Sequence, residues 1–133
     1  AKDAISKAYA PYSGYKVGAA VQLANGEIVT GSNQENVAFP SGLCAERVAV
    51  FAAASQFPGV AIQTIAITSK SKVFKINTPV TPCGACRQAI AEYESIQDGK
   101  IRILMRGNEG KIYLAEGIEN LLPLMFRADQ LKI

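Results

Sequence analysis

The sequence contains no histidine and no tryptophan, and it has only three cysteines in 133 residues. Without histidine, any metal site must be built from thiolates and carboxylates, and a carboxylate becomes the natural proton carrier near neutral pH. A low and odd number of cysteines excludes a disulfide scaffold. It favours reduced thiols that have a chemical task.

Long apolar runs are also missing. No stretch approaches the roughly 18 to 20 consecutive apolar residues of a membrane span, and no basic-then-apolar leader opens the chain. We therefore expect a soluble, cytoplasmic protein that does not contact a membrane. Lys and Arg (14) nearly balance Asp and Glu (11), and no two basic residues are adjacent, which argues against nucleic-acid binding. The length and the hydrophobic share of 49% predict a single domain, residues 1–133.

Turn-forming residues divide the chain into short helices and strands. The Asn25-Gly26 pair predicts a tight hairpin turn, and the segment 43–56 is apolar around the whole helical wheel, which predicts burial on nearly all sides. The order of elements predicts an α/β layered domain with one mixed sheet covered by helices. The pattern indicates helices over 2–9, 43–56, 83–94 and 118–122, and strands over 17–23, 28–31, 60–68, 101–105 and 111–114.

All three cysteines lie at the predicted starts of two helices. Cys83 and Cys86 are three residues apart, so their sulfurs project to the same side of a first turn and can share one metal with Cys44. A closed structural zinc site takes four protein ligands, usually Cys or His. Three cysteines leave one position open for water, which is the pattern of a catalytic site. We expect one Zn²⁺ per chain.

Glu46 follows Cys44 by two residues, so its carboxylate can lie near the metal without having to coordinate it. Apolar, water-poor surroundings would raise its pKa toward neutrality, and this predicts a general acid and base. Three thiolates overcompensate a doubly charged zinc ion. The two helix N-termini, Arg47 and Arg87 are candidates to offset the excess negative charge.

Further motifs accompany the cysteines along nearly the whole chain. They are Ala10-Pro11-Tyr12-Ser13, Val17-Gly18-Ala19-Ala20, Gly31 to Asn36, Cys44-Ala45-Glu46-Arg47, Pro82 to Gln88 and Leu121-Leu122-Pro123. In these motifs the sequence resembles the cytidine deaminase family, in particular its small homotetrameric type, whose zinc chemistry uses a non-ligand Glu and a Pro-Cys-x-x-Cys motif. The resemblance implies a three-layer α/β/α sandwich with a mixed five-stranded sheet. It also implies hydrolytic deamination of cytidine and deoxycytidine to uridine and deoxyuridine, with release of ammonia, in pyrimidine salvage.

The same resemblance implies roles for substrate-binding residues. Asn33 and Glu35 correspond to a pair that holds the ribose 3′-hydroxyl, and Tyr15 corresponds to the aromatic beside the pyrimidine. Ala45 corresponds to a residue whose backbone amide contacts the base. Phe126 matches an aromatic that completes the pocket of a neighbouring subunit, which implies a homotetramer with shared active sites. The expected partner is a small-molecule nucleoside rather than a nucleic acid.

The sequence departs from the family pattern at the rim of this site, and two alternatives stay open. Phe39 stands where many relatives carry Tyr, Val37 differs, and the segment 69–79 is longer than usual. One alternative is a deaminase of another aminopyrimidine nucleoside such as blasticidin S, although Asn33-x-Glu35-Asn36 and Phe126 favour cytidine. The other is a structural zinc module in which Asp or Glu supplies a fourth ligand.

Overall fold

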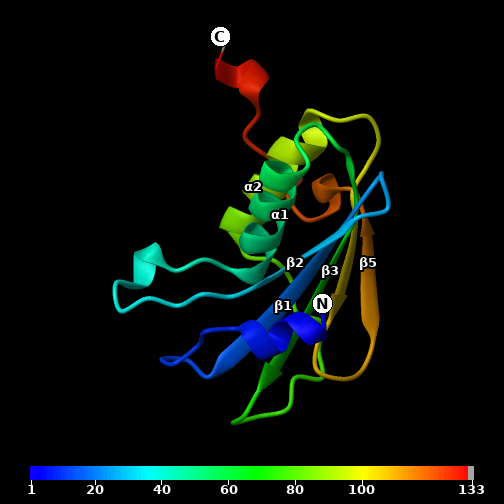
Figure 1. The fold of residues 1–133 in the computed structure, drawn as a ribbon. Coiled ribbons are helices and arrows are strands. Elements are labelled where there is room, and N and C mark those ends of the chain that lie inside the picture. The colour runs from blue at the N-terminus through cyan, green and yellow to red at the C-terminus, as the bar shows by residue number, and fades with distance from the viewer. Residues whose placement is uncertain (132–133) are drawn as a thin grey trace.

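The computed structural model describes residues 1–131, which form one five-stranded sheet, two α-helices and short 3-10 helices (Figure 1). The predicted elements are present, although the predicted helices 2–9 and 118–122 are shorter and of 3-10 type. The strands are β1 (Tyr15–Leu23), β2 (Ile28–Ser32), β3 (Ile62–Ser71), β4 (Arg102–Arg106) and β5 (Ile112–Glu116). The helices are α1 (Ala45–Gln56), α2 (Gly84–Ser95), η1 (Asp3–Lys7), η2 (Phe39–Ser41), η3 (Ile118–Asn120) and η4 (Ala128–Leu131).

The sheet is mixed and has the strand order β2-β1-β3-β4-β5. Strand β1 is antiparallel to β2 and β3, β3 is parallel to β4, and β5 is antiparallel to β4. The predicted turn between β1 and β2 has Gly26 at φ +87°, a conformation that glycine adopts without strain. The predicted α/β class and mixed five-stranded sheet are therefore confirmed.

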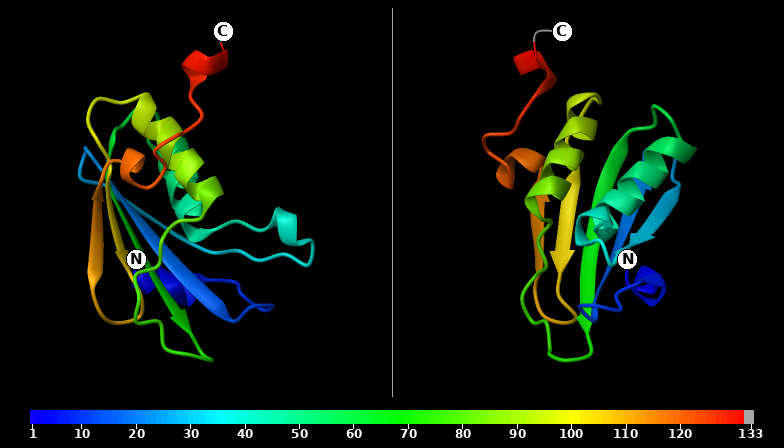
Figure 2. Two further views of the ribbon diagram at one scale, coloured as in Figure 1. Left: turned by 180° about the vertical axis from the view of Figure 1, so that it is seen from behind. Right: turned by 90° about the vertical axis from the view of Figure 1, so that its left-hand side faces the viewer.

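The handedness of the connections places α1 and α2 on the same face of the sheet. Strands β2, β3 and β4 run in the same direction, and α1 joins β2 to β3 while α2 joins β3 to β4. Both crossovers move the same way across the sheet, so right-handed connections put both helices on one side. Figure 2 shows the two helices side by side there. Their N-termini consequently meet at the edge where β2 and β3 end.

The core lies between this face and the two helices. Helix α1 approaches the sheet closely because it faces it with alanines and because β2 carries Gly31. A Cβ at Gly31 would lie 2.4 Å from the backbone nitrogen of Ala49 and 2.6 Å from the carbonyl oxygen of Ala45. The buried apolar side chains include Ala19, Val21, Leu23, Ala49, Val50, Ala53, Ile65, Ile67, Ile90, Ile103 and Met105.

The opposite face of the sheet is covered beside β1 by η1. Gly18 and Gly31 belong to adjacent register pairs, so they face opposite sides of the sheet. A Cβ at Gly18 would lie 3.0 Å from the backbone nitrogen of Ile5, so the missing side chain lets η1 sit directly on the strand. The second helical layer on this face is therefore contributed by a short 3-10 helix from the start of the chain.

The outer side of α1 is less buried than the sequence pattern predicts. Phe51 is 41% exposed, and the ring of Tyr93 on α2 lies beside it, at 6.4 Å between centroids. The prediction of burial on nearly all sides is wrong for the single chain, because no described element covers this side of the helix.

Within residues 1–131, no helix has the length and apolar character needed to cross a membrane.

Replacing Gly31 with alanine should destabilise the fold, because the added Cβ would force α1 away from β2. Overpacking of this kind costs about 2 kcal/mol of unfolding free energy, which urea denaturation can measure. Gly84→Ala is the matched control, since a Cβ there meets nothing within 4 Å and should leave stability unchanged or slightly raised. Equal stability of Gly31→Ala and wild type would contradict the close approach of helix and strand.

Candidate active site

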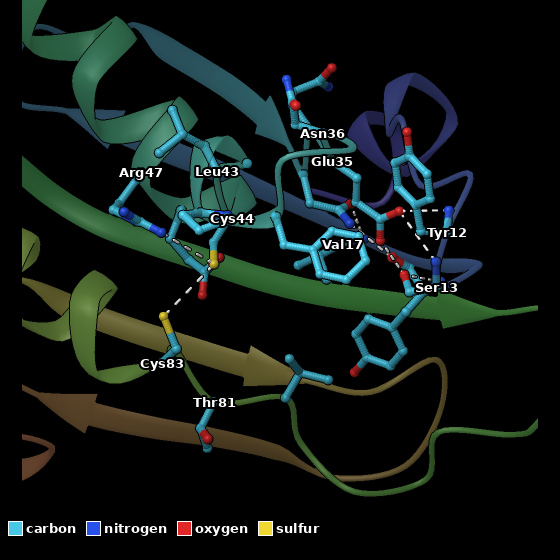
Figure 3. Close-up of a pocket in the computed structure, with 18 residues that line it drawn as sticks. Tyr12, Ser13, Val17, Glu35, Asn36, Leu43, Cys44, Arg47, Thr81 and Cys83 are labelled. Atoms are coloured by element: carbon cyan, nitrogen blue, oxygen red, sulfur yellow. Dashed lines mark hydrogen bonds between the residues drawn. The ribbon is translucent and has the colours of Figure 1, made fainter.

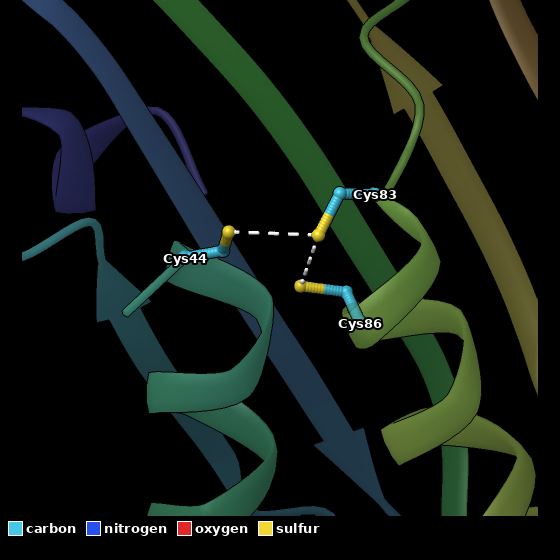
Figure 4. A group of neighbouring side chains, drawn as sticks. All are labelled: Cys44, Cys83 and Cys86. Atoms are coloured by element: carbon cyan, nitrogen blue, oxygen red, sulfur yellow. Dashed lines mark hydrogen bonds between the residues drawn. The ribbon is translucent and has the colours of Figure 1, made fainter. Parts of the chain in front are cut away.

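Each of the two α-helices begins at a cysteine. Cys44 is the N-cap residue of α1 and Cys83 is the N-cap residue of α2, and both have extended backbones with ψ of 153° and 168°. Cys86 follows in the first turn of α2 (Figure 4). The partial positive charge of a helix N-terminus favours thiolate over thiol. Because both helices start at one edge of the sheet, cysteines that are distant in sequence become neighbours.

The spacing of the three sulfurs fits a zinc ion. The Sγ of Cys83 lies 3.7 Å from that of Cys44 and 3.6 Å from that of Cys86, and all three lie within 4.8 Å of one another. A tetrahedral zinc with Zn–S bonds of about 2.3 Å separates its sulfurs by about 3.8 Å. Among the described residues this ligand group contains no carboxylate and no fourth cysteine. This arrangement leaves one coordination position open and disfavours the closed structural module.

Arg47 supports negative charge on the sulfurs. Its Nη2 donates to the Sγ of Cys44 at 3.7 Å, and this contact raises the pKa of the guanidinium. The pKa of Cys44 falls to about 5, first through hydrogen bonding with Cys86 and then through Arg47. The pKa of Cys86 is raised by the same interaction with Cys44 and by burial. The position expected for charge compensation at the thiolates is therefore occupied by Arg47.

Arg87 does not have the position predicted for it. Its Nε donates to the carbonyl oxygen of Pro82 at 2.7 Å, and its Nη1 donates to the carbonyl oxygen of Leu121 at 2.6 Å. The guanidinium therefore points along the backbone that precedes α2 and toward the C-terminal segment. It fixes the loop that carries Cys83 and, among the described residues, donates to no sulfur, so it lacks the contact expected of a candidate to offset the charge of the thiolates.

Glu46 is almost completely buried beside the cysteines. Its exposed fraction is 4%, and it lines the same pocket as Cys44 and Cys83. Burial raises the pKa of the Glu46 carboxyl to about 6, and the negative charge of Cys44 acts in the same direction while Arg47 opposes it. A carboxyl with a pKa in this range can both accept and release a proton near neutral pH.

A pocket of about 880 Å³ extends from the sulfurs to the loop between η1 and β1 (Figure 3). Cys44 and Cys83 lie at one end of it, and Ser13 and Glu35 lie at the other. Glu46, two residues after Cys44, also lines it. Its volume is within the range of about 300–1,000 Å³ for small-molecule sites. The pocket combines apolar walls with a few polar groups at its two ends, as expected for a compact ligand with two recognisable parts.

Glu35 and Asn33 order the polar end of the pocket. Glu35 accepts hydrogen bonds from the amides of Tyr12 (2.9 Å) and Ser13 (3.3 Å) and from the Ser13 hydroxyl, and the hydroxyl contact lowers the pKa of Glu35 most. Asn33 accepts from the Val17 amide and donates to the Tyr15 carbonyl oxygen, each at 2.8 Å. These bonds tie the start of β1 to the segment after β2.

Of the remaining predicted residues, Tyr15 lines the pocket, Ala45 begins α1, and Phe126 lies outside the pocket. Tyr15 lines the pocket, and its hydroxyl lies 3.3 Å from the Oγ of Ser69. Ala45 is buried as the first residue of α1, where backbone amides have no partner within the helix. Phe126 is 56% exposed and does not line the pocket of its own chain, although its backbone is held by Gln88.

The pocket also contains residues for which the sequence predicted no role in substrate binding. Tyr12 and Phe39 both line the pocket, and their rings meet edge to face with centroids 5.8 Å apart. Phe39 thus contributes an apolar wall to the pocket. Ser13 and Thr81 supply hydroxyl groups to the lining. Ser13 could have been inferred from the turn before Gly14, because the amides of Tyr12 and Ser13 in this turn need an acceptor such as Glu35. Nothing in the sequence indicates a role for Thr81.

Comparison with known proteins gives consistent matches over most of the chain. The family model described as the cytidine and deoxycytidylate deaminase zinc-binding region matches residues 1–101. A cytidine deaminase of Sporosarcina psychrophila is 37% identical over 131 residues, or 98% of this chain and 88% of the relative. The cytidine deaminase of Halalkalibacterium halodurans is 38% identical over 127 residues, or 93% of this chain and 86% of the relative.

Solved structures agree with these sequence matches. The crystal structure of cytidine deaminase from Burkholderia pseudomallei has a TM-score of 0.81 and 35% identity, covering 95% of this chain and 93% of the other. The enzyme from Mycobacterium tuberculosis has a TM-score of 0.72 and 32% identity, covering 96% and 91%. With a family match over three quarters of its length and three sulfurs at zinc-like spacing, this chain belongs to the cytidine and deoxycytidylate deaminase zinc-binding family.

Proposed function

We propose that this protein hydrolyses cytidine and deoxycytidine to uridine and deoxyuridine and releases ammonia. The observation that carries this proposal is the group of three sulfurs at zinc-like spacing in a pocket that also contains the buried carboxyl of Glu46. Two relatives named cytidine deaminase, which match this chain over almost its full length, support the proposal. The corresponding biological role is pyrimidine salvage in the cytoplasm.

Each end of the pocket binds a different part of the nucleoside. The base is placed toward the sulfurs, with the amide of Ala45 directed at it and the ring of Tyr15 beside it. The ribose is placed toward Asn33 and Glu35. Glu35 is held by the loop at Ser13, so its carboxylate is already oriented to accept a hydrogen bond from a sugar hydroxyl.

Glu46 is assigned the proton transfers. It accepts a proton from the attacking water and passes it to the ring nitrogen next to the amino-bearing carbon. The new carbon–oxygen bond forms as this carbon becomes tetrahedral. Glu46, again a carboxylate, then takes the proton of the new hydroxyl group and delivers it to the amine as the carbon–nitrogen bond breaks. The carbon regains a carbonyl, so that one water is consumed and one ammonia is released. The burial of Glu46 keeps bulk water from competing for this proton.

Cys44, Cys83 and Cys86 are the residues that would hold zinc. When bound there, zinc supplies Lewis acidity that lowers the pKa of water toward neutrality. Arg47 contributes by withdrawing charge from the sulfur of Cys44, which counteracts the excess negative charge of three thiolates. In this scheme Arg47 tunes the centre and does not contact the substrate.

We also propose a homotetramer in which subunits share active sites. Phe126 is exposed, lies outside the pocket of its own chain and is fixed by Gln88, so a second copy can receive its side chain. The exposed outer side of α1 around Phe51 is an apolar surface of the kind that association covers. Both features support association of identical chains.

Replacing Cys86 with serine should reduce zinc binding, because a fully buried thiolate ligand is lost. The loss should exceed the 10–100-fold decrease typical of changes outside the ligand set. Zinc per chain, measured by atomic absorption after dialysis, should be near one for the wild-type protein and for Thr81→Ser, a pocket-lining control. Full zinc content in Cys86→Ser would contradict the three-sulfur site.

Replacing Glu46 with glutamine should lower kcat for cytidine by at least about 100-fold while zinc is retained, because the proton carrier is removed and the shape is kept. The measurement is conversion of cytidine to uridine, with blasticidin S as the competing substrate. Glu27→Gln, in the exposed hairpin turn, is the matched control and should keep wild-type activity. Activity of Glu46→Gln within about tenfold of wild type would contradict the assignment.

Mixing two inactive variants tests whether active sites are shared. Coexpressed Glu46→Gln and Phe126→Ala chains should recover activity, because a mixed site can combine Glu46 from one chain with Phe126 from the other. Each variant is assayed alone for comparison, and the mass of the assembly is measured by light scattering. If both variants are weakly active alone and the mixture gives only their average, Phe126 acts within its own chain or not at all.

A further inference from the structure

A second hollow, of about 460 Å³, lies on the face of the sheet that η1 covers. Four lysines line it, and they come from three separate parts of the chain. Lys2 precedes η1, Lys16 lies on β1, and Lys70 and Lys72 lie at and just beyond the end of β3. Ser6 and Asn108 add uncharged polar groups. We call these six residues the basic pocket.

The register of the sheet places two of these lysines directly opposite each other. Lys16 pairs with Lys70 across the antiparallel β1–β3 ladder, and the next pair on the same face is Gly18 with Thr68. Directly opposite side chains have Cβ atoms about 5 Å apart, and like charges at such positions destabilise a sheet. The strand pair therefore has an electrostatic cost that a bound anion would relieve.

Among the described residues, no lysine of the basic pocket forms an ion pair with a carboxylate. The ion pairs of residues 1–131 involve Lys75 and Lys100, and none involves a lysine of the basic pocket. The lining of the hollow contains no Asp or Glu. The whole chain has a net charge of only +3, so the clustering of four ammonium groups at one hollow is a local feature.

The hollow exists because η1 sits against β1 at Gly18. A Cβ at that position would lie 3.0 Å from the backbone nitrogen of Ile5 and 3.1 Å from its Cγ1, so η1 forms a wall beside the strand lysines. Figure 1 shows η1 next to the lower part of β1. With this wall, the four lysines line a hollow and do not form a flat basic surface.

We propose that the basic pocket binds the polyphosphate group of a small molecule, either inorganic polyphosphate or a nucleoside triphosphate. Four ammonium groups exceed what a single phosphate would need, whereas a chain of phosphates supplies matching charge. The lysines converge on one hollow and form no stripe along which a nucleic-acid backbone could run. The hydroxyl of Ser6 and the amide of Asn108 can donate further hydrogen bonds to phosphate oxygens.

This site is independent of the nucleoside pocket, although the two share strands. Tyr15 and Ser69 immediately precede Lys16 and Lys70, and their side chains meet on the other face of the sheet. The test therefore uses binding and stability, which do not depend on deaminase activity.

The experiment titrates tripolyphosphate, and separately ATP, into the full-length zinc-loaded protein at low ionic strength. Calorimetry should show one site per chain, and the melting temperature should rise with tripolyphosphate but not with sulfate at the same ionic strength. Zinc content is measured after each titration, because polyphosphates chelate metals. Tighter binding of ATP identifies a nucleotide as the ligand type, and equal affinity identifies the phosphate chain alone.

The double variant Lys16→Gln/Lys70→Gln should bind tripolyphosphate at least about tenfold more weakly, while the control Lys7→Gln, on η1 but outside the hollow, should bind like wild type. Without ligand, the double variant should melt at a higher temperature than wild type at low salt, because the like-charge pair is gone. A misfolded variant would instead melt at a lower temperature, so the rise in melting temperature distinguishes lost binding from misfolding. Equal affinity of the double variant and the control, or an equal effect of sulfate, would overturn the proposal.

Discussion

The meeting of two helix N-termini at one edge of the sheet is the constraint on which the site depends. Right-handed crossovers from β2 through α1 to β3, and from β3 through α2 to β4, leave both helices on one face and start them at the same edge. A cysteine at each N-cap then brings its sulfur close to the other sulfur. The partial positive charges of both helices favour the thiolate forms that a metal needs. Topology thus supplies both the geometry and part of the electrostatics of the centre.

Close packing then holds the starts of α1 and α2 in place. Gly31 lets α1 rest its backbone on β2, and the alanines facing the sheet leave little space beneath the helix. Arg87 holds the approach to α2 through two backbone carbonyls. Both cysteine-bearing helix starts are therefore anchored by groups that do not touch the metal. Glu46 gains its burial from the same packing, so the features that hold the helices also set the environment of the proposed proton carrier.

The sequence was sufficient to predict the parts of the site whose chemistry is local. Helix geometry alone predicts that Cys83 and Cys86 share a metal and that Glu46 lies near Cys44. The periodicity of apolar residues and the turn residues alone predict the strands. Features that depend on packing between distant segments could not be predicted in this way. Arg87 has the same sequence relation to Cys86 as Arg47 has to Glu46, yet only one of these arginines reaches a sulfur. The lysines of the basic pocket are scattered in sequence and become neighbours only through strand register.

The absence of histidine from the ligand set has a consequence for the redox behaviour of this protein. All three ligands are cysteines whose sulfurs lie within 4.8 Å of one another, and hydrogen bonding with Cys86 and Arg47 lowers the pKa of Cys44, which favours its thiolate form. Thiolates are the forms that oxidants attack, giving sulfenic acids that a neighbouring thiol can convert to a disulfide. A zinc ion held by these cysteines would occupy sulfur lone pairs and slow this attack. Loss of the ion therefore exposes the protein to covalent damage that later addition of zinc alone does not reverse.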